Sequence, residues 1–167
     1  GCRLLDVCTG SGCILLSLLA ECKDRIAMAM GVDISKDALQ VAIANGNRME
    51  LPAEFRESDL FTHVTGTYDV IVSNPPYVAS MDILTLDSSV RDYEPLGALD
   101  GGEDGLMFYR AIVSHWTQIL RPGGWLMFEV GEDQADAVMA LMTEEKYTDV
   151  TALEDTAGIR RVVVGRI

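Results

Sequence analysis

The sequence predicts an α/β fold in which seven strands form a mostly parallel sheet with helices on both faces. Segments typical of strands alternate with segments typical of helices along most of the chain, and such alternation produces a parallel sheet covered by crossover helices. The last two predicted strands follow one another without a helix, so we expect an antiparallel hairpin at one edge. The length of 167 residues suits one domain.

Each predicted element follows from its apolar pattern and its flanking residues. Short apolar runs predict strands at residues 4–8, 27–34, 53–57, 68–73, 125–130, 147–153 and 160–165. Longer segments predict helices at residues 12–22, 36–49, 103–120 and 132–144. Ser35 is expected to cap the second helix. Residues 78–102 are too long for a simple connection, which is typical of a lid or binding loop.

Composition narrows the classes of function. The chain has 26 acidic and 13 basic residues, a formal charge of −13. Because an acidic chain repels phosphates, direct nucleic-acid binding is disfavoured, although a local basic patch would still allow it. The sequence has no run of 18 apolar residues that would predict a membrane span. Four cysteines without a CxxC pair or a histidine cluster indicate buried, reduced thiols in a cytoplasmic protein rather than a zinc site.

A glycine turn and an acidic residue predict a cofactor that contains a nucleoside. Residues 6–12 (Asp-Val-Cys-Thr-Gly-Ser-Gly) join the first strand to the first helix, and glycines at such a junction let a ligand approach the backbone. Asp33 ends the second strand, where a carboxylate accepts hydrogen bonds from ribose hydroxyls. A dinucleotide would need a third glycine where Leu15 stands. The residues therefore favour S-adenosylmethionine over NAD.

Two further positions extend the expected cofactor site. Asp6 is placed to meet the ammonium group at the amino-acid end of S-adenosylmethionine. Residues 58–61 (Ser-Asp-Leu-Phe) follow the third strand, where Asp59 would meet the edge of an adenine and Leu60 its face.

Residues 74–77 (Asn-Pro-Pro-Tyr) form a rigid loop at the end of the fourth strand. Neither proline can donate to a strand ladder, and each restricts the residue before it. The loop offers the amide of Asn74, backbone carbonyls and the aromatic face of Tyr77. Such groups suit a planar –NH2 group. Glutamine and adenine both carry one, so the loop alone leaves both substrates open.

Together these motifs resemble those of class I S-adenosylmethionine-dependent methyltransferases, whose fold is a Rossmann-like three-layer sandwich. Further segments narrow the resemblance to the HemK/PrmC family over essentially the whole chain: residues 93–95 (Tyr-Glu-Pro), 98–102 (Ala-Leu-Asp-Gly-Gly), 104–106, 128–131 with Gln134, and 155–166. Members of that family methylate the side-chain amide nitrogen of a glutamine in peptide chain release factors. The resemblance therefore implies a release factor as protein partner.

The resemblance also implies site residues. The cofactor positions are Asp6, Cys8, Thr9, Gly10, Ser11, Gly12, Asp33, Asp59, Leu60 and Asn74. The substrate positions are Asn74, Pro75, Pro76 and Tyr77, of which Asn74, Pro75 and Tyr77 are the catalytic ones, and no metal is expected. Cys8 replaces a glycine found in many methyltransferases and is not expected to be a nucleophile. Family members carry an amino-terminal helical domain that helps bind the release factor, and residues 1–167 contain no counterpart.

The mechanism expected from these residues relies on geometry and electrostatics. The Asn74 side-chain oxygen and the Pro75 carbonyl would accept the two N–H bonds of the target amide, while Tyr77 would pack on its plane. Three alternatives remain open: a glutamine of a ribosomal protein, the exocyclic amine of adenine in DNA or RNA, and a catalytically idle domain that binds the cofactor as a scaffold. Because the chain begins inside its first predicted strand, we also expect it to be part of a longer protein.

Overall fold

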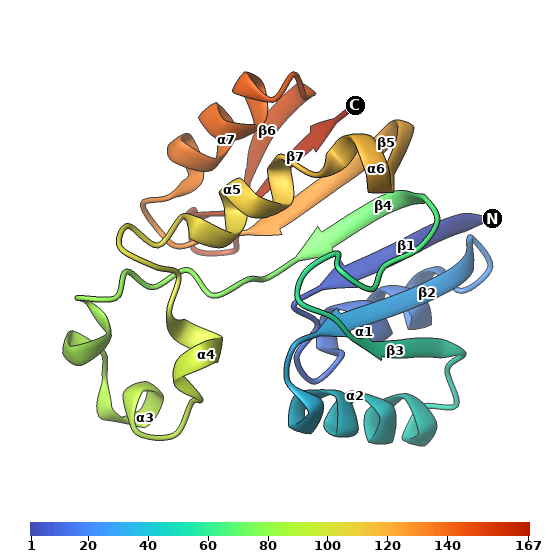
Figure 1. Cartoon of the computed structure of the whole chain (residues 1–167), viewed down its shortest axis with the longest axis horizontal. Helices are drawn as coiled ribbons and strands as arrows, with labels where there is room; N and C mark the ends of the chain where they lie inside the picture. The colour runs from blue at the N-terminus through green and yellow to red at the C-terminus, as the bar shows by residue number, and fades with distance from the viewer.

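The computed structural model is built around a seven-stranded sheet with strand order β3-β2-β1-β4-β5-β7-β6 (Figure 1). The strands are β1 (Cys2–Val7), β2 (Ile26–Asp33), β3 (Ala53–Glu57), β4 (Tyr68–Ser73), β5 (Leu120–Glu129), β6 (Thr148–Glu154) and β7 (Arg160–Arg166). Strands β1 to β5 are parallel, and β7 runs antiparallel to β5 and β6. The structure describes the backbone of residues 1–167 and all side chains except those of residues 116 and 117. The predicted fold class is confirmed.

Helices cover both faces of the sheet, which makes three layers (Figure 1). The helices are α1 (Cys13–Cys22), α2 (Lys36–Arg48), α3 (Ser88–Arg91), α4 (Leu96–Leu99), α5 (Met107–Val113), α6 (Trp116–Ile119) and α7 (Ala135–Glu144), with a 3₁₀ turn at Ile83–Thr85. Of these, α3 and α4 lie away from the sheet (Figure 1). Successive residues of β1 point to opposite faces: Leu4 packs in a cluster with Leu15 of α1, and Leu5 packs in one with Tyr109 of α5. No helix in the described part of the chain is long and apolar enough to cross a membrane.

The predicted helix over residues 103–120 is wrong. Gly105 has a φ of 73°, which an α-helix cannot contain, so helix α5 begins only at Met107. Its other end is set by side chains that compete for the Ala111 carbonyl: Ser114 Oγ donates to that oxygen at 3.1 Å, and His115 Nδ1 lies 2.6 Å from it. A separate short helix, α6, follows. Residues 120–124 join β5 instead of ending a helix, and the Gly123 N–H donates to the Ile167 carbonyl at 2.6 Å.

Residues 78–106, called the 78–106 segment below, connect β4 to α5 and contain three short helical turns where the sequence predicts an irregular stretch. Backbone hydrogen bonds close the base of this segment. The Val78 N–H donates to the Leu99 carbonyl at 2.9 Å, the Gly101 N–H donates to the Val78 carbonyl at 2.8 Å, and the Ser80 N–H donates to the Gly102 carbonyl at 2.9 Å. The segment is thus a long loop with a paired stem.

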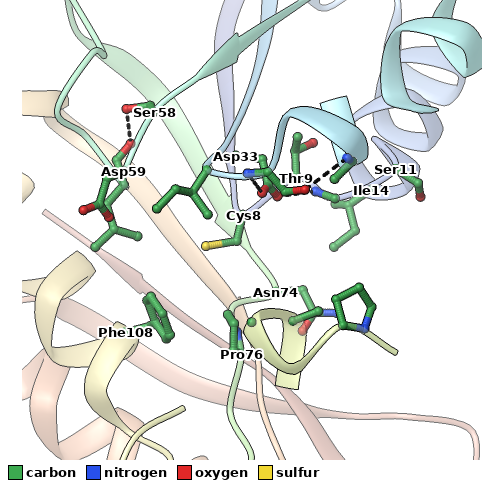
Figure 2. A pocket seen from close by; sticks show the side chains of 18 of the residues that line it. Cys8, Thr9, Ser11, Ile14, Asp33, Ser58, Asp59, Asn74, Pro76 and Phe108 are labelled. Atoms are coloured by element: carbon green, nitrogen blue, oxygen red, sulfur yellow. Dashed lines mark hydrogen bonds between the residues drawn. The ribbon is translucent and has the colours of Figure 1, made fainter. Parts of the chain in front are cut away.

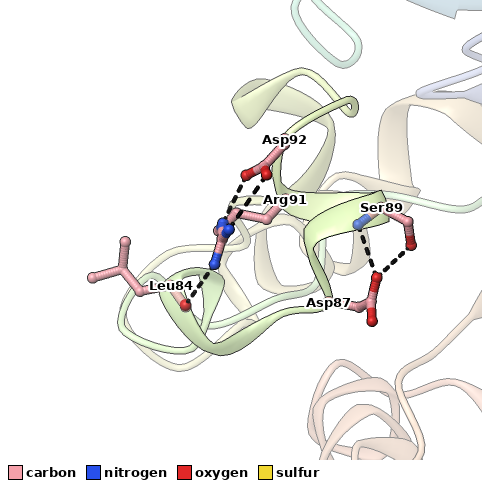
Figure 3. Close-up of polar contacts among 5 residues, drawn as sticks. All are labelled: Leu84, Asp87, Ser89, Arg91 and Asp92. Atoms are coloured by element: carbon pink, nitrogen blue, oxygen red, sulfur yellow. Dashed lines mark hydrogen bonds and ion pairs between the residues drawn. The ribbon is translucent and has the colours of Figure 1, made fainter.

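The 78–106 segment carries seven acidic residues and one basic residue, Arg91. Figure 3 shows how that cation is held: its Nε donates to Asp92 at 2.8 Å and its Nη1 reaches the Leu84 carbonyl at 3.5 Å. Nearby, the Asp87 carboxylate accepts from the backbone N–H of Ser89 at 2.8 Å and begins α3. Because the charge of Arg91 is neutralised by a partner within the segment, the surface of the 78–106 segment is strongly negative.

Candidate active site

A pocket of about 800 Å³ opens at the carboxyl ends of β1, β2 and β4. Parallel sheets bind ligands at this edge, because the strand order reverses between β1 and β4. Figure 2 shows Thr9 and Asp33 on one side of the cavity and Asn74, Pro76 and Phe108 on the other. The lining consists of Cys8, Thr9, Gly10, Ser11, Cys13, Ile14, Asp33, Ile34, Ser35, Ala38, Ser58, Asp59, Leu60, Asn74, Pro76, Pro95, Gly97, Ala98, Met107 and Phe108.

The glycine turn between β1 and α1 forms one wall of the pocket. Cys8, Gly10 and Gly12 all have positive φ angles, of 59°, 56° and 77°. A Cβ atom on Gly10 would meet nothing within 4 Å, so the backbone there faces open space that a ligand can occupy. Gly12 instead packs close to Phe55 and lies outside the lining. The turn therefore presents Cys8 to Ser11 to the pocket.

Asp33 ties the glycine turn to the end of β2. Its Oδ2 accepts from the Gly10 N–H at 2.8 Å, and its Oδ1 accepts from the Ser35 N–H at 2.9 Å. Each carboxylate oxygen keeps a free lone pair, because such an oxygen accepts two hydrogen bonds. Ser35 caps α2 by accepting from the Ala38 N–H at 3.2 Å, which confirms the predicted N-cap. Asp33 is thus held rigidly at the pocket with capacity for two further donors.

Asp6 lies behind the turn, outside the lining, and only 1% of it is exposed. Thr9 Oγ1 donates to its Oδ2 at 2.7 Å, while its Oδ1 has no hydrogen-bond partner among the described residues. Burial raises the pKa of Asp6 to about 7, and the nearby Asp33 charge adds to the effect. An unpartnered buried carboxylate oxygen favours protonation or a bound cation.

The sulfur of Cys8 is not poised for nucleophilic chemistry. Burial, together with the nearby charges of Asp33 and Asp6, raises the pKa of this thiol to about 12. The thiol therefore stays protonated at neutral pH. All four cysteines are free thiols, but Cys13 is exposed and the other three are only partly buried, so the expectation of buried cysteines is wrong. No group of three metal-ligating side chains occurs among the described residues.

The loop after β3 supplies another part of the pocket wall. Ser58 is buried, and its hydroxyl donates to the Leu60 carbonyl at 2.8 Å while it accepts from the His63 N–H at 3.0 Å. These bonds hold Leu60 at a φ of 46°, which side chains rarely adopt. The strained turn places Asp59 and Leu60 in the lining.

The Asn74–Tyr77 loop faces the glycine turn across the pocket (Figure 2). Ser73 Oγ donates to the Val7 carbonyl at 2.7 Å, which fixes the end of β4 against the end of β1. Asn74 and Pro76 line the pocket, whereas Pro75 is buried and Tyr77 packs against the core. Within the described part of the chain, the Asn74 side-chain amide and the Pro75 carbonyl make no hydrogen bond. The Asn74 amide is therefore available to a ligand in the pocket, whereas Pro75 lies outside the lining.

Part of the lining comes from segments in which the sequence predicts no individual site residue. Residues 78–102 are expected to form a lid or binding loop, and the structure places Pro95, Gly97 and Ala98 of that loop in the lining, with Phe108 of α5. Ile34 also lines the pocket and is 67% exposed, an exposure that the sequence does not reveal.

The fold and the pocket define a class: an α/β protein with a ligand-sized pocket at the carboxyl ends of its parallel strands. The chain belongs to the methyltransferase small domain family, whose model matches residues 1–87. A methyltransferase of Pyrococcus furiosus has a similar fold, with a TM-score of 0.73 at 19% identity, over 99% of this chain and 75% of that one.

Two relatives point to one branch of the methyltransferases. A release factor glutamine methyltransferase of Geobacter sulfurreducens is 42% identical over 98% of this chain and 57% of its own length. One of Agrobacterium fabrum is 40% identical over 98% of this chain and 57% of its own length. The resemblance read from the sequence motifs is thereby confirmed. The chain spans less than two thirds of these relatives.

Proposed function

We propose that this chain is the catalytic domain of a protein that transfers a methyl group from S-adenosylmethionine to a glutamine side-chain amide in a peptide chain release factor. The observation that carries the proposal is the Asn74–Tyr77 loop, whose unpaired Asn74 amide lines the same pocket as the glycine turn. The similarity to release factor glutamine methyltransferases over 98% of the chain supports the choice of substrate.

The pocket residues fit the proposed cofactor. S-adenosylmethionine supplies, when bound, a methyl group on a positively charged sulfur. Asp33 would accept from the ribose hydroxyls, because its oxygens keep free lone pairs beside the open space at Gly10. Asp59 and Leu60 would hold the adenine by its edge and face. Cys8, Thr9, Ser11 and Gly12 would shape the turn, and Asp6, which lies behind it, would act on the ammonium group of the cofactor by its charge rather than by direct contact.

The chain would activate a poor nucleophile by orienting it. An amide nitrogen has a delocalised lone pair, so its methylation needs alignment and stabilisation of the positive charge that develops. The Asn74 Oδ1 and the Pro75 carbonyl would accept the two N–H bonds, and Pro76 and Tyr77 would border the amide plane. No general base is required before transfer, because the methylated nitrogen becomes strongly acidic.

The charge at the mouth of the pocket separates the candidate substrates. The 78–106 segment carries seven acidic residues, and its one arginine is paired with Asp92. This surface repels a phosphate backbone and favours a basic polypeptide. A protein glutamine is therefore the better substrate, and adenine in DNA or RNA is the second candidate, since its exocyclic amine would suit the same loop.

The proposal is tested by incubating the protein with S-adenosylmethionine labelled in its methyl group and three acceptors: a release factor, ribosomal proteins and nucleic acid. We expect label in the release factor, on a glutamine identified by mass spectrometry. Label in nucleic acid or in ribosomal proteins alone would overturn the proposal in favour of that substrate. Because the relatives are longer than this chain, the assay includes the full-length protein.

Cofactor affinity is expected to rise with pH because of Asp6. The pKa of Asp6 is about 7 in the free protein, and a bound cation would lower it. Binding therefore releases a proton below about pH 7, and affinity increases by up to about tenfold per pH unit between the bound and free pKa values.

Calorimetry at about pH 6 in two buffers of different ionisation heat measures the released proton. Asp6→Asn should abolish the release, and Asp37→Asn, on the exposed first turn of α2, should not. Proton release that persists in Asp6→Asn would assign it to another group.

A further inference from the structure

The side-chain amide of Gln134 joins three separate loops at the back of the candidate active site. Its Nε2 donates to the Tyr77 carbonyl at 2.9 Å and to the Gly105 carbonyl at 3.3 Å. Its Oε1 accepts from the Gly131 N–H at 3.0 Å. One amide thus connects the Asn74–Tyr77 loop, the end of the 78–106 segment and the loop after β5.

The surroundings allow only one orientation of this amide. Nε2 faces two acceptors and Oε1 faces a donor, so a flipped amide would oppose two carbonyls with its oxygen. A Cβ atom on Gly105 would lie 2.7 Å from Gln134 Nε2, and one on Gly131 would lie 2.8 Å from its Oε1. Glycine at both positions lets the two backbones approach the amide closely. Gln134 is half-buried at the N-cap of α7, so its backbone is fixed as well.

We propose that Gln134 is a positioning residue that orients the Asn74–Tyr77 loop for catalysis. It does not line the pocket, so it acts through the loop and not by touching the substrate. The Tyr77 carbonyl is taken by Gln134, whereas the Pro75 carbonyl makes no hydrogen bond in the described part of the chain. Fixing the Tyr77 carbonyl sets the direction of the peptide units that precede it. The Pro75 carbonyl is left free for the target amide. This inference rests on the proposed function.

The stem of the 78–106 segment strengthens this link. A Cβ atom on Gly101 would lie 2.8 Å from the Tyr77 Cα and 2.9 Å from the Pro76 carbonyl oxygen. The stem backbone therefore packs directly on the loop, and Gln134 holds the far end of that contact through Gly105. Loss of the amide would release the loop and the stem together.

Three variants at position 134 test the inference. Gln134→Glu keeps the shape, but its carboxylate opposes the two carbonyls. We expect a loss of roughly tenfold to a hundredfold in kcat, as for a small misplacement of reacting groups, with cofactor Kd within about twofold of wild type. Below the pKa of the introduced carboxyl group its O–H can donate to the Tyr77 carbonyl, so activity should recover as pH falls. Gln134→Met, similar in volume, should lose activity at every pH. Gln134→Ala should behave as Gln134→Met does.

A matched control variant shows whether the effects come from position 134. Gln118→Glu makes the same chemical change at an exposed site on α6. The ionisable groups within three residues of Gln134 or of its partners Tyr77, Gly105 and Gly131 are Tyr77 itself, Glu103, Asp104, Glu129, Glu132, Asp133 and Asp136. Asp104 pairs with Arg110 and Asp136 with Arg160. They are present in every variant, so a difference between pH profiles reports position 134 itself.

Hydrogen exchange provides a readout that does not depend on turnover. Residues 77–79 and 101–106 should exchange faster in Gln134→Glu than in wild type at the same pH, while residues 2–7 should not change. Unchanged exchange, or folded Gln134→Met with wild-type kcat, would overturn the positioning role. If the wild-type protein methylates no glutamine but exchange still changes, the proposed substrate fails and the structural link stands.

Discussion

Replacement of Asn74 by alanine is expected to abolish methyl transfer while cofactor binding weakens by much less. The Asn74 amide lines the pocket and makes no hydrogen bond with the described residues, so its removal breaks no internal contact. It removes the acceptor that would align the target nitrogen and stabilise its developing charge. Loss of one such preorganised group typically costs about 100-fold to 1,000-fold in kcat.

Single-turnover kinetics and calorimetry of the same preparations measure the two effects of Asn74→Ala. Asn47→Ala, an exposed position near the end of α2, is the matched control and should behave as wild type. Asn74→Asp keeps an acceptor oxygen and should retain more activity than Asn74→Ala. Turnover of Asn74→Ala close to the wild-type rate would contradict the proposed mechanism.

Replacement of Asp33 by alanine is expected to weaken cofactor binding by roughly 10-fold to 100-fold, since hydrogen bonds to charged groups contribute about 1.5–3 kcal/mol. Two effects add. The ribose would lose its acceptor, and the Gly10 and Ser35 N–H groups would lose theirs, which loosens the glycine turn. At saturating cofactor, kcat should change little, because Asp33 does not contact the Asn74 loop.

The Kd and the melting temperature distinguish these two contributions from Asp33. Asp33→Asn keeps one acceptor oxygen and should fall between wild type and Asp33→Ala in both measurements. Asp37→Ala, in the first turn of α2, removes a neighbouring carboxylate without removing a pocket contact. An unchanged Kd in folded Asp33→Ala would exclude a role for this carboxylate in cofactor binding.

Much of the fold could be predicted because local patterns decide it. The predicted bounds of β3 and β4 match the structure, since turn residues flank both short segments. The predicted helix over residues 103–120 failed because its apolar pattern continues through residues whose backbone cannot be helical. Gly105 has a positive φ, and the side chains of Ser114 and His115 bind the Ala111 carbonyl. Hydrophobic periodicity does not predict such a backbone angle or such side-chain contacts with a single carbonyl.

The site was predictable where it lies at the ends of strands. The turn after β1, Asp33 and Asn74 all follow an apolar run, and parallel strands bring such positions together. Pro95 to Ala98 and Phe108 could not be placed, because the path of the 78–106 segment depends on its stem hydrogen bonds. Asp6 was expected to face the cofactor, but it lies behind the turn and reaches the pocket only through its neighbours.

The paired stem of the 78–106 segment has a consequence for how such a protein diverges. Backbone hydrogen bonds between residues 78–80 and residues 99–102 close the loop at its base, so residues 81–98 leave and rejoin the fold at one point. Changes of length or sequence within them need not move Asn74 or Gly105. Residues 81–94, which exclude the pocket-lining Pro95 to Ala98, are therefore a replaceable part of the loop, through which the choice of acceptor protein can evolve or be redesigned while the chemistry beneath it stays the same.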